Sequence, residues 1–401
     1  MSAKRKTTVA VLFGGRSVEH DVSVVTGNQV MRAFDPERYE VVPVYINRDG
    51  KWFTGEPLLD LKTYQNEVAS MKGVHEAILS PATHHHGLII DPVSGLFTKN
   101  AVKRLDVVFP ALHGSHGEDG TVQGLCELAD IAYVGCGVLA SALANDKIMT
   151  KTVLKQHGIP VVDGAAVSRA EWETNPDAVI ERITATLPYP VFIKPATLGS
   201  SIGVGRADSE ALLRASLDVA THFDRMVLVE AAVTDGQEIN CAVMGNQMKL
   251  RASVLEEPVS WDKFLTYEEK YLRGREGMKS ADRIIPAPLS DELTAKVKDI
   301  TLHAFRAIDG RGTARIDFLV KEDTVYLNEI NTMPGSLAFY LWQHEGMSQS
   351  DVVHELVDLA REAYAEKRRN TYNYQTNLIE VAAMRGLKGV KGAKAARPVQ
   401  G

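Results

Sequence analysis

The sequence of 401 residues has only three cysteines, Cys126, Cys136 and Cys241, and none of them belongs to a CxxC pair. Three isolated cysteines supply neither a disulfide framework nor a zinc site, and they fit a reducing cytoplasm. No apolar run approaches transmembrane length, and the basic N-terminus leads into a β-rich stretch instead of the apolar core of a signal peptide. We therefore expect a cytoplasmic protein without a membrane partner.

An excess of basic residues is also missing, because the formal net charge is −6. Nucleic-acid binding proteins carry a basic domain or stripe, so we expect small molecules as partners and no nucleic acid. The remaining composition, with 45% hydrophobic and 24% charged residues, is typical of soluble globular proteins. A chain of this length has room for two or three domains.

The first part of the chain has the pattern of a small α/β domain. An apolar strand-like run at 8–13 ends in two glycines, and an amphipathic stretch at 19–34 follows it. Further strands are predicted at 39–46 and 106–112. Three adjacent histidines at 84–86 cannot all face one metal ion, so we predict an exposed loop there.

A second region of helices and strands begins near residue 139. The periodicity predicts a helix over 139–157, which Gly158 ends. Strands are predicted at 191–194 and 227–230. Beyond Arg369 the pattern weakens among basic residues, Gly and Ala, and this composition predicts a mobile, solvated tail.

Two consecutive apolar runs within 315–331 carry polar side chains and are predicted to form a β-hairpin. Side chains alternate along a strand, so Arg315 and Asp317 share one face of the first run. Glu329 and Asn331 share one face of the second. If the turn brings these faces together, their carboxylate and amide oxygens could bind Mg²⁺ together with substrate phosphates. The Arg315 guanidinium could then stabilise a developing negative charge. The alternative is a half-solvated hairpin edge with a surface ion pair.

The segment 197–205 is a loop of small and hydroxyl residues that follows Lys194. Glycine amides, hydroxyls and a lysine suit a flap over phosphates, although the loop lacks the Walker A pattern. A simple hairpin turn is the alternative. Downstream, the segment 228–233 reads as a strand that runs into a connector, where Glu230 and backbone groups could bind an adenine.

Three further segments are candidates for a site or its lid. The segment 113–120 follows a buried strand and is rich in Gly and ionisable groups, at the point where α/β sheets bind ligands. A polar surface turn is the alternative. Glu19 lies at a predicted helix N-terminus, where it could bind a substrate ammonium or simply favour the helix dipole. The segment 267–271 mixes charge and aromatic rings in a stretch of the kind that closes over sites.

Taken in order, these motifs resemble the D-alanine–D-alanine ligases of the ATP-grasp superfamily, over about residues 9–359. The set is specific because seven elements occur in the same order. They are GGRSVEHDVS from Gly14, ALHGSHGEDGTVQG from Ala111, DK from Asp146, FIKPATLGSSIGVG from Phe192, EEKY from Glu268, RIDF from Arg315 and NEINTMPG from Asn328.

The resemblance implies an α/β fold with a three-domain ATP-grasp architecture and an N-terminal Rossmann-like pre-ATP-grasp domain. The implied boundaries are 1–140, 141–226 and 227–370, with a basic tail at 371–401. The implied reaction is ligation of two D-alanines through a D-alanyl phosphate for peptidoglycan precursors. It uses ATP and two Mg²⁺ ions, for which Mn²⁺ could substitute, and a homodimer is expected.

The resemblance also implies a role for individual residues. Metal ligands would be Asp317, Glu329 and Asn331. The catalytic residues would be Glu19, Ser200, Tyr271, Arg315 and Gly335. ATP would contact Lys147, Lys194, Ser200, Ser201, Glu230, Ala231, Val233, Glu238, Lys270 and Asn328, and the amino acids would contact Glu19, His113, Arg315, Tyr340 and Leu341.

One departure concerns the acceptor amino acid, because Tyr340 and Leu341 stand where many of these ligases carry a Ser-Leu pair for its carboxylate. A tyrosine hydroxyl can also donate to a carboxylate, as can a main-chain amide. A D-serine or D-lactate acceptor is therefore an alternative, although Tyr271 argues against D-lactate. A non-catalytic binding module is the alternative from another class, and the three metal ligands argue against it. The segment 56–100 and the tail have no functional account.

Overall fold

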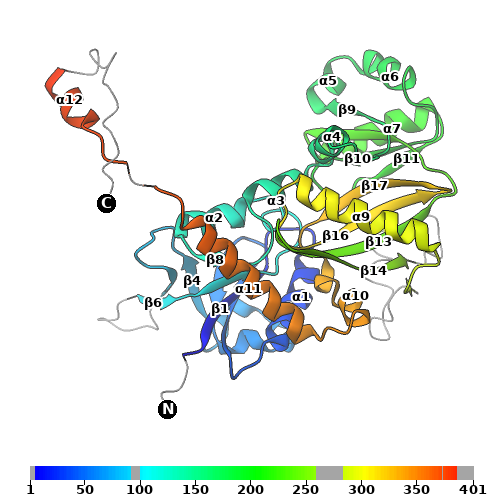
Figure 1. Cartoon of the computed structure of the whole chain (residues 1–401). Helices are drawn as coiled ribbons and strands as arrows, with labels where there is room; N and C mark the ends of the chain where they lie inside the picture. The colour runs from blue at the N-terminus through cyan, green and yellow to red at the C-terminus, as the bar shows by residue number, and fades with distance from the viewer. Residues whose placement is uncertain (1–4, 92–99, 259–282, 373, 386–401) are drawn as a thin grey trace. The chain divides into compact units, whose positions relative to one another are not determined.

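The structure, a computed structural model, describes residues 5–91, 100–258, 283–372 and 374–385. Residues 1–361 form one compact unit, and residues 362–401 form a second, smaller one. Three separate sheets organise the first unit (Figure 1). Among the described residues, no helix is both long enough and apolar enough to cross a membrane.

The first sheet has eight strands in the order β6-β5-β4-β3-β2-β1-β7-β8. Its centre is parallel, because β1 pairs in parallel with β2 and β7, and β7 pairs in parallel with β8. The remaining pairs are antiparallel. The strands are β1 (Thr7–Gly14), β2 (Tyr39–Ile46), β3 (Trp52–Thr54), β4 (His75–Leu79), β5 (Gly87–Ile90), β6 (Ala101–Arg104), β7 (Val107–Pro110) and β8 (Ala132–Tyr133).

Because β1 and β7 are neighbours, the loops that follow them meet at one edge of the sheet. The first loop leads into α1 (His20–Ala33), and the second leads into α2 (Thr121–Ala129). Ser23 of α1 joins both loops, since its hydroxyl accepts from the Gly14 amide at 2.9 Å and donates to the Ala111 carbonyl at 2.7 Å. This edge is the usual ligand-binding position of an α/β sheet.

The segment between β3 and β7 extends the sheet on its far side. It contains the short 3-10 helices η1 (Glu56–Leu59), η2 (Leu61–Gln65) and η3 (Val68–Ser70), followed by β4, β5 and β6. The three histidines at 84–86 lie in the turn between β4 and β5, which confirms the predicted loop, although only His84 is exposed and the other two are half-buried.

The second sheet is antiparallel, with the order β11-β10-β12-β9. Apolar faces of its strands and helices form one core, which includes Val179, Ile183, Leu213 and Leu217. The elements are β9 (Gly164–Ser168), α5 (Arg169–Thr174), α6 (Pro176–Thr184), β10 (Val191–Pro195), β11 (Gly205–Ala207), α7 (Glu210–Phe223) and β12 (Met226–Ala231).

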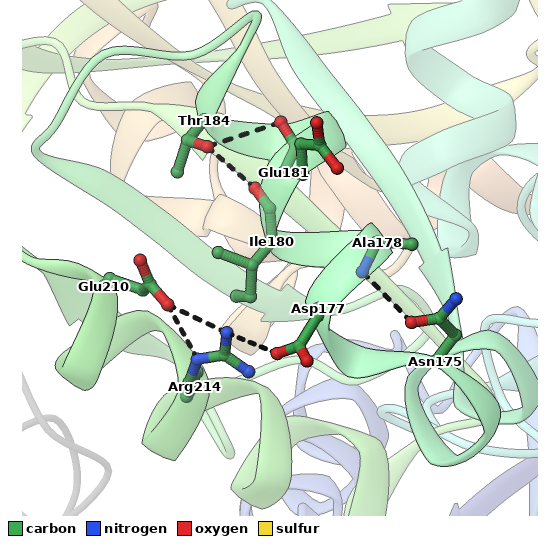
Figure 2. Close-up of polar contacts among 8 residues, drawn as sticks. All are labelled: Asn175, Asp177, Ala178, Ile180, Glu181, Thr184, Glu210 and Arg214. Atoms are coloured by element: carbon green, nitrogen blue, oxygen red, sulfur yellow. Dashed lines mark hydrogen bonds and ion pairs between the residues drawn. The ribbon is translucent and has the colours of Figure 1, made fainter.

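Polar contacts on the outer side tie α6 to α7 (Figure 2). The Asn175 side chain caps α6 by accepting from the Ala178 amide at 3.2 Å. The Arg214 guanidinium of α7 donates to both Asp177 and Glu210 at 2.8 Å. These groups are largely exposed, so they add little to stability beside the apolar core.

The third sheet is antiparallel, with the order β15-β14-β13-β16-β17. One face is apolar and packs with α9 (Asp291–Ala307), and its core includes Ile316, Phe318 and Leu327. The strands are β13 (Gln237–Gly245), β14 (Leu250–Pro258), β15 (Arg283–Ile284), β16 (Gly312–Lys321) and β17 (Thr324–Asn331).

A β-bulge in β17 decides which side chains reach the polar face of this sheet. The pairing with β16 skips Asn328, which has no residue opposite it. Strict alternation would place Val325, Leu327, Glu329 and Asn331 on one face, and an inserted residue reverses that alternation. Val325 and Leu327 are therefore fully buried in the core, whereas Glu329 and Asn331 line a cavity.

The helix predicted over 139–157 is two helices, α3 (Val138–Asn145) and α4 (Lys147–Gln156). They separate at Asp146, whose extended backbone ends α3 and whose carboxylate accepts from the amides of Ile148 and Met149 at 3.0 and 3.1 Å. This is a helix N-cap, which satisfies amides that lack partners in the first turn. Gly158, with a φ of +70°, follows α4 as predicted.

The last elements are η4 (Gly335–Ala338), α10 (Phe339–His344), α11 (Gln349–Lys367) and α12 (Leu378–Arg385). Part of the predicted tail thus forms α12. The boundary predicted at residue 226 falls on the first residue of β12, which pairs within the second sheet. The domain boundaries remain predictions.

Candidate active site

The predicted hairpin is confirmed, because β16 and β17 pair with Asp317 opposite Glu329 and Arg315 opposite Asn331. The Arg315 guanidinium donates to both oxygens of the Asp317 carboxylate at 2.6 and 2.7 Å. The Asn331 amide nitrogen donates to the same carboxylate at 3.0 Å. The sheet pairing therefore brings the four predicted side chains together on one face.

The electrostatics of this face suit a bound cation. Burial raises the pKa of Asp317 to about 6, the Arg315 guanidinium opposes the shift, and the Glu329 carboxylate adds to it. Two neighbouring carboxylates repel each other, and a divalent cation between them would remove that repulsion. In the described part of the chain no cluster of three or more His, Cys, Asp or Glu side chains could hold a metal. Two carboxylates and an amide are nevertheless sufficient for Mg²⁺ that also binds phosphates.

The polar face extends across four strands as one row of side chains. Glu256 of β14 pairs with Asn240 of β13, Asn240 pairs with Asp317 of β16, and Asp317 pairs with Glu329 of β17. Glu256 and Asn240 are both buried. Directly paired residues project on the same face of a sheet, so Glu256 belongs to the same surface as the predicted metal ligands.

Two lysines and a glutamate form a buried ionic cluster between the second and third sheets. The Glu230 side chain is only 3% exposed, and its carboxylate pairs with Lys194 at 2.7 Å and with Lys151. Lys194 also donates to the Asn328 side-chain oxygen at 3.1 Å. Burial alone would raise the pKa of Glu230, but the two lysines outweigh it and lower the pKa to about 2. Glu230 is therefore a charged anchor for the predicted phosphate ligand Lys194.

Lys147 is the first residue of α4, and its ammonium donates to the Leu198 carbonyl in the predicted flap at 2.7 Å. Burial lowers its pKa, and the Glu329 carboxylate opposes that shift. One narrow cavity lies between the loops of the first sheet, the flap and the metal-ligand face. Its lining is Glu19, Gly114, Glu118, Ala144, Asn145, Lys147, 197–200, and 329–332.

The flap lies between β10 and β11, and it contacts the first sheet through Ser200. The Ser200 hydroxyl donates to the Glu19 carboxylate, which joins two members of the hydrogen-bonded trio Glu19, Ser200 and Tyr271 that the family resemblance implies. Ser200 and Ser201 both have positive φ, 54° and 58°, a conformation that L-residues rarely adopt and that clusters at functional sites. The third member, Tyr271, and the predicted ATP contact Lys270 lie outside the described residues.

The predicted nucleoside contacts follow β12. The Ala231 amide donates to the Asp163 carbonyl at 3.0 Å, so this N–H already has a protein partner. Val233 is half-buried, and Glu238 is exposed, yet Glu238 is near enough to Lys194 and Asp317 to raise the pKa of both. These three residues remain predicted contacts.

Glu118 fixes the loop after β7, although the sequence motifs did not identify it as a site residue. Its carboxylate accepts from the Gly114 amide at 2.9 Å and from the Met333 amide at 3.0 Å. Burial raises the pKa of Glu118 to about 8, and the Glu19 carboxylate contributes to the shift. Glu118 thus links the loop of the first sheet to the segment before Gly335.

His113 belongs to the same junction. Its Nε2 lies 2.8 Å from the Thr26 hydroxyl of α1, and that hydroxyl accepts from the Ser336 amide at 3.2 Å. Burial lowers the pKa of His113 to about 4, so the ring is neutral near pH 7. Ser336, Leu337 and Ala338 after Gly335 all have φ near +50°, a left-handed conformation that L-residues rarely adopt and that clusters at functional sites.

Comparisons with known proteins identify the family of this chain. The family model described as D-ala D-ala ligase N-terminus matches residues 8–136, and the model described as D-ala D-ala ligase C-terminus matches residues 153–358. The chain belongs to the D-alanine–D-alanine ligase family. It is 39% identical over 375 residues to the D-alanine–D-alanine ligase of Geobacillus thermodenitrificans, covering 92% of this chain and 100% of the relative.

Other relatives cover the chain to a similar extent. The D-alanine–D-alanine ligase of Natranaerobius thermophilus is 38% identical over 381 residues, covering 92% of this chain and 99% of the relative. Among solved structures, the VanG D-Ala:D-Ser ligase from Enterococcus faecalis aligns with a TM-score of 0.76 at 29% identity, covering 89% of this chain and 100% of that one. The D-alanine-D-alanine ligase from Coxiella burnetii aligns with a TM-score of 0.76 at 26% identity, covering 95% and 99%. The expected ATP-grasp fold is confirmed.

Tyr340 and Leu341, the two residues predicted to bind the acceptor amino acid, lie in different environments. The Tyr340 hydroxyl donates to the Glu256 carboxylate at 2.5 Å, and Tyr340 is half-buried. Leu341 is fully buried in the protein. The role of both residues in acceptor binding remains a prediction.

Replacing Glu230 by glutamine is expected to weaken ATP binding and to destabilise the fold. A neutral amide leaves the Lys151 and Lys194 ammoniums in repulsion, and breaking a buried pair costs about 3–5 kcal/mol. The KM for ATP should rise while that for D-alanine changes little, and the free energy of unfolding should fall in urea titrations. Because the folded pKa of Glu230 is depressed to about 2, this stabilisation is present above about pH 4.5 and is lost as the pH falls toward 2.

Glu210→Gln is the matched control for this variant, because Glu210 forms an exposed ion pair with Arg214 (Figure 2). Exposed pairs contribute about 0–1 kcal/mol. An unfolding free energy for Glu230→Gln no lower than that of the control, with an unchanged KM for ATP, would contradict the anchoring role.

Proposed function

We propose that this protein joins two D-alanine molecules into D-alanyl-D-alanine with ATP, for the synthesis of peptidoglycan precursors. The carboxylate of the first D-alanine is phosphorylated, and the amine of the second attacks the resulting D-alanyl phosphate, which releases ADP and phosphate. The observation that carries this proposal is the paired arrangement of Arg315, Asp317, Glu329 and Asn331 beside the buried lysines.

The donor D-alanine would occupy the narrow cavity between the first sheet and the flap. Glu19 would bind its ammonium, with His113 in the wall behind it. Lys147 and Lys194 would hold ATP phosphates, because two lysine charges suit that polyanion. Ser200 and Ser201 of the flap would cover the phosphates, which keeps water from the acyl phosphate.

The residues on the third sheet would act on the charge that develops during the reaction. Asp317, Glu329 and Asn331 fit two Mg²⁺ ions, with Mn²⁺ as a substitute, and bound metal would neutralise phosphate charge during transfer. Arg315 and the Gly335 amide would bind the oxyanion of the tetrahedral intermediate. Lys270 and Tyr271 would complete the ATP site and the lid. We also expect a homodimer in the cytoplasm, on the family resemblance alone.

The test measures ADP formation by the purified protein at saturating ATP and Mg²⁺, with and without D-alanine, together with the mass of the product. We expect ADP only with D-alanine, and D-alanyl-D-alanine as the product. D-serine and D-lactate are added in separate reactions with D-alanine. Absence of D-alanine-dependent ADP would contradict ligase activity, and a mixed product in preference to the dipeptide would assign another acceptor.

A further inference from the structure

The side chains around Tyr340 form a three-membered cluster at the end of the polar row on the third sheet. The Tyr340 hydroxyl donates to one oxygen of Glu256 at 2.5 Å. The Arg283 guanidinium contacts the other oxygen at 3.1 Å, and its central carbon lies 4.0 Å from the centre of the Tyr340 ring. Glu256 is 2% exposed, whereas the Arg283 side chain is 34% exposed.

The hydrogen bond to Glu256 decides what the tyrosine can offer to a substrate. A phenol has a single O–H donor, and here that donor points at a buried carboxylate. If it turned to a substrate carboxylate, Glu256 would lose a charge-assisted hydrogen bond in a buried position, which is unfavourable. The hydroxyl is therefore poorly suited to bind the acceptor carboxylate.

Arg283 has the donors that this position needs. A guanidinium carries five N–H groups in a planar fork, more than the one Glu256 oxygen that faces Nη1 can accept. The Tyr340 ring and the Glu256 carboxylate fix the plane and the position of the fork, which reduces the entropy lost when it binds a ligand. Its partial exposure leaves it open to a small molecule.

The cluster also lies beside the predicted oxyanion site. Glu256 and Tyr340 are both near enough to affect the electrostatics of Arg315, and Glu256 lies in the same cross-strand row as Asp317. An acceptor whose amine attacks a carbonyl held by Arg315 would extend its carboxylate a few ångströms away. An anion needs a cation there, because the nearby Glu256 carboxylate would otherwise repel it.

We propose that Arg283 binds the carboxylate of the acceptor amino acid, with Glu256 and Tyr340 as positioning residues that hold the guanidinium. The proposal rests on the ligase function proposed above. It assigns to Arg283 the contact with the acceptor carboxylate, which the sequence position of Tyr340 had first suggested for the tyrosine hydroxyl. The site selects acceptors with a free carboxylate.

A competition between two acceptors tests this assignment in a single reaction. D-alanine and D-alaninamide are supplied at equal concentration with ATP, and the two products are quantified by mass spectrometry. D-alaninamide has no carboxylate to be phosphorylated, so it can act only as acceptor, and its amine displaces phosphate as that of D-alanine does. The ratio of dipeptide to dipeptide amide is independent of ATP binding, donor binding and the amount of active enzyme.

In Arg283→Gln the ratio is expected to fall by about tenfold to a hundredfold, the range that corresponds to loss of a hydrogen bond to a charged group. Arg283→Lys keeps the charge and should give an intermediate ratio. If Arg283 only supports α10, both products fall together and the ratio does not change, which would overturn the proposal. If Arg283→Gln does not fold, Glu256→Gln/Arg283→Gln removes both charges and should show the same fall in ratio; an unchanged ratio there overturns the proposal equally.

Arg251→Gln is the matched control, because Arg251 makes the same two kinds of contact, with an aromatic ring of α10 and with a carboxylate, which here belongs to α11. Its guanidinium lies 5.4 Å from the Trp342 ring centre and pairs with Glu355. We expect the wild-type product ratio in this variant. The wild-type reaction separates the ligase function from the role of Arg283. Absence of any dipeptide would refute the ligase function itself. Normal dipeptide formation by the wild type, with an unchanged product ratio in Arg283→Gln, would refute only the role of Arg283.

Discussion

Replacing Arg315 by lysine is expected to lower kcat by about 100- to 1,000-fold, the usual cost of losing one donor to an oxyanion. Lysine keeps the positive charge but loses the planar fork, which donates to both oxygens of Asp317 at 2.6 and 2.7 Å. The ammonium can then satisfy either Asp317 or the oxyanion, and with poorer geometry. Steady-state kinetics should show the loss in kcat, with a smaller change in the KM for ATP.

Arg214→Lys provides the comparison for this variant. Arg214 also donates to two carboxylates, but on the outer side of α6 and α7 (Figure 2). Its replacement should leave kcat within about twofold of the wild type, since exposed pairs contribute about 0–1 kcal/mol. A kcat for Arg315→Lys as high as that of the control would remove Arg315 from the oxyanion site.

Glu329→Gln is expected to lower turnover by at least about a hundredfold, because bound metal supplies several kcal/mol of charge stabilisation in phosphoryl transfer. Glutamine has nearly the same shape as glutamate but no charge, so Asp317 becomes the only carboxylate of the predicted ligand set. Binding of Mn²⁺, followed by electron paramagnetic resonance without turnover, should weaken in parallel.

Glu322→Gln is the control within the same hairpin, because Glu322 is exposed in the turn between β16 and β17. It should bind Mn²⁺ and turn over as the wild type does. Full activity with unchanged Mn²⁺ binding in Glu329→Gln would show that Glu329 is not a metal ligand. Circular dichroism checks that both variants are folded.

The polar face of the third sheet illustrates what the sequence could predict. The alternation of side chains along two strands joined by a short turn predicts that Arg315 and Asp317 face Glu329 and Asn331. The strand pairing confirms this. The same alternation, continued backward along β17, would expose Leu327 on the polar face. Only the bulge at Asn328 resolves that conflict, and a bulge depends on the partner strand, which short-range patterns do not contain.

Other features depend on contacts between residues far apart in the chain. Pairing of Lys151 with Glu230 joins α4 to β12, and no spacing rule connects residues so far apart. Lys151 does lie four residues after Lys147 on one helix face, a signal that could have drawn attention to it. The break between α3 and α4 was also accessible, because Asp146 before Lys147 is a typical helix N-cap.

The Glu118 carboxylate has a consequence for how substrates can enter. It holds the Gly114 amide of the loop after β7 and the Met333 amide near the predicted oxyanion site, so separating these two segments would leave a buried N–H without a partner. The flap, in contrast, is held by hydrogen bonds between side chains and flap groups, from the Ser200 hydroxyl to Glu19 and from the Lys147 ammonium to the Leu198 carbonyl. We therefore expect the segments that carry Gly114 and Met333 to stay together, and we expect the flap to be the part that moves when each amino acid enters.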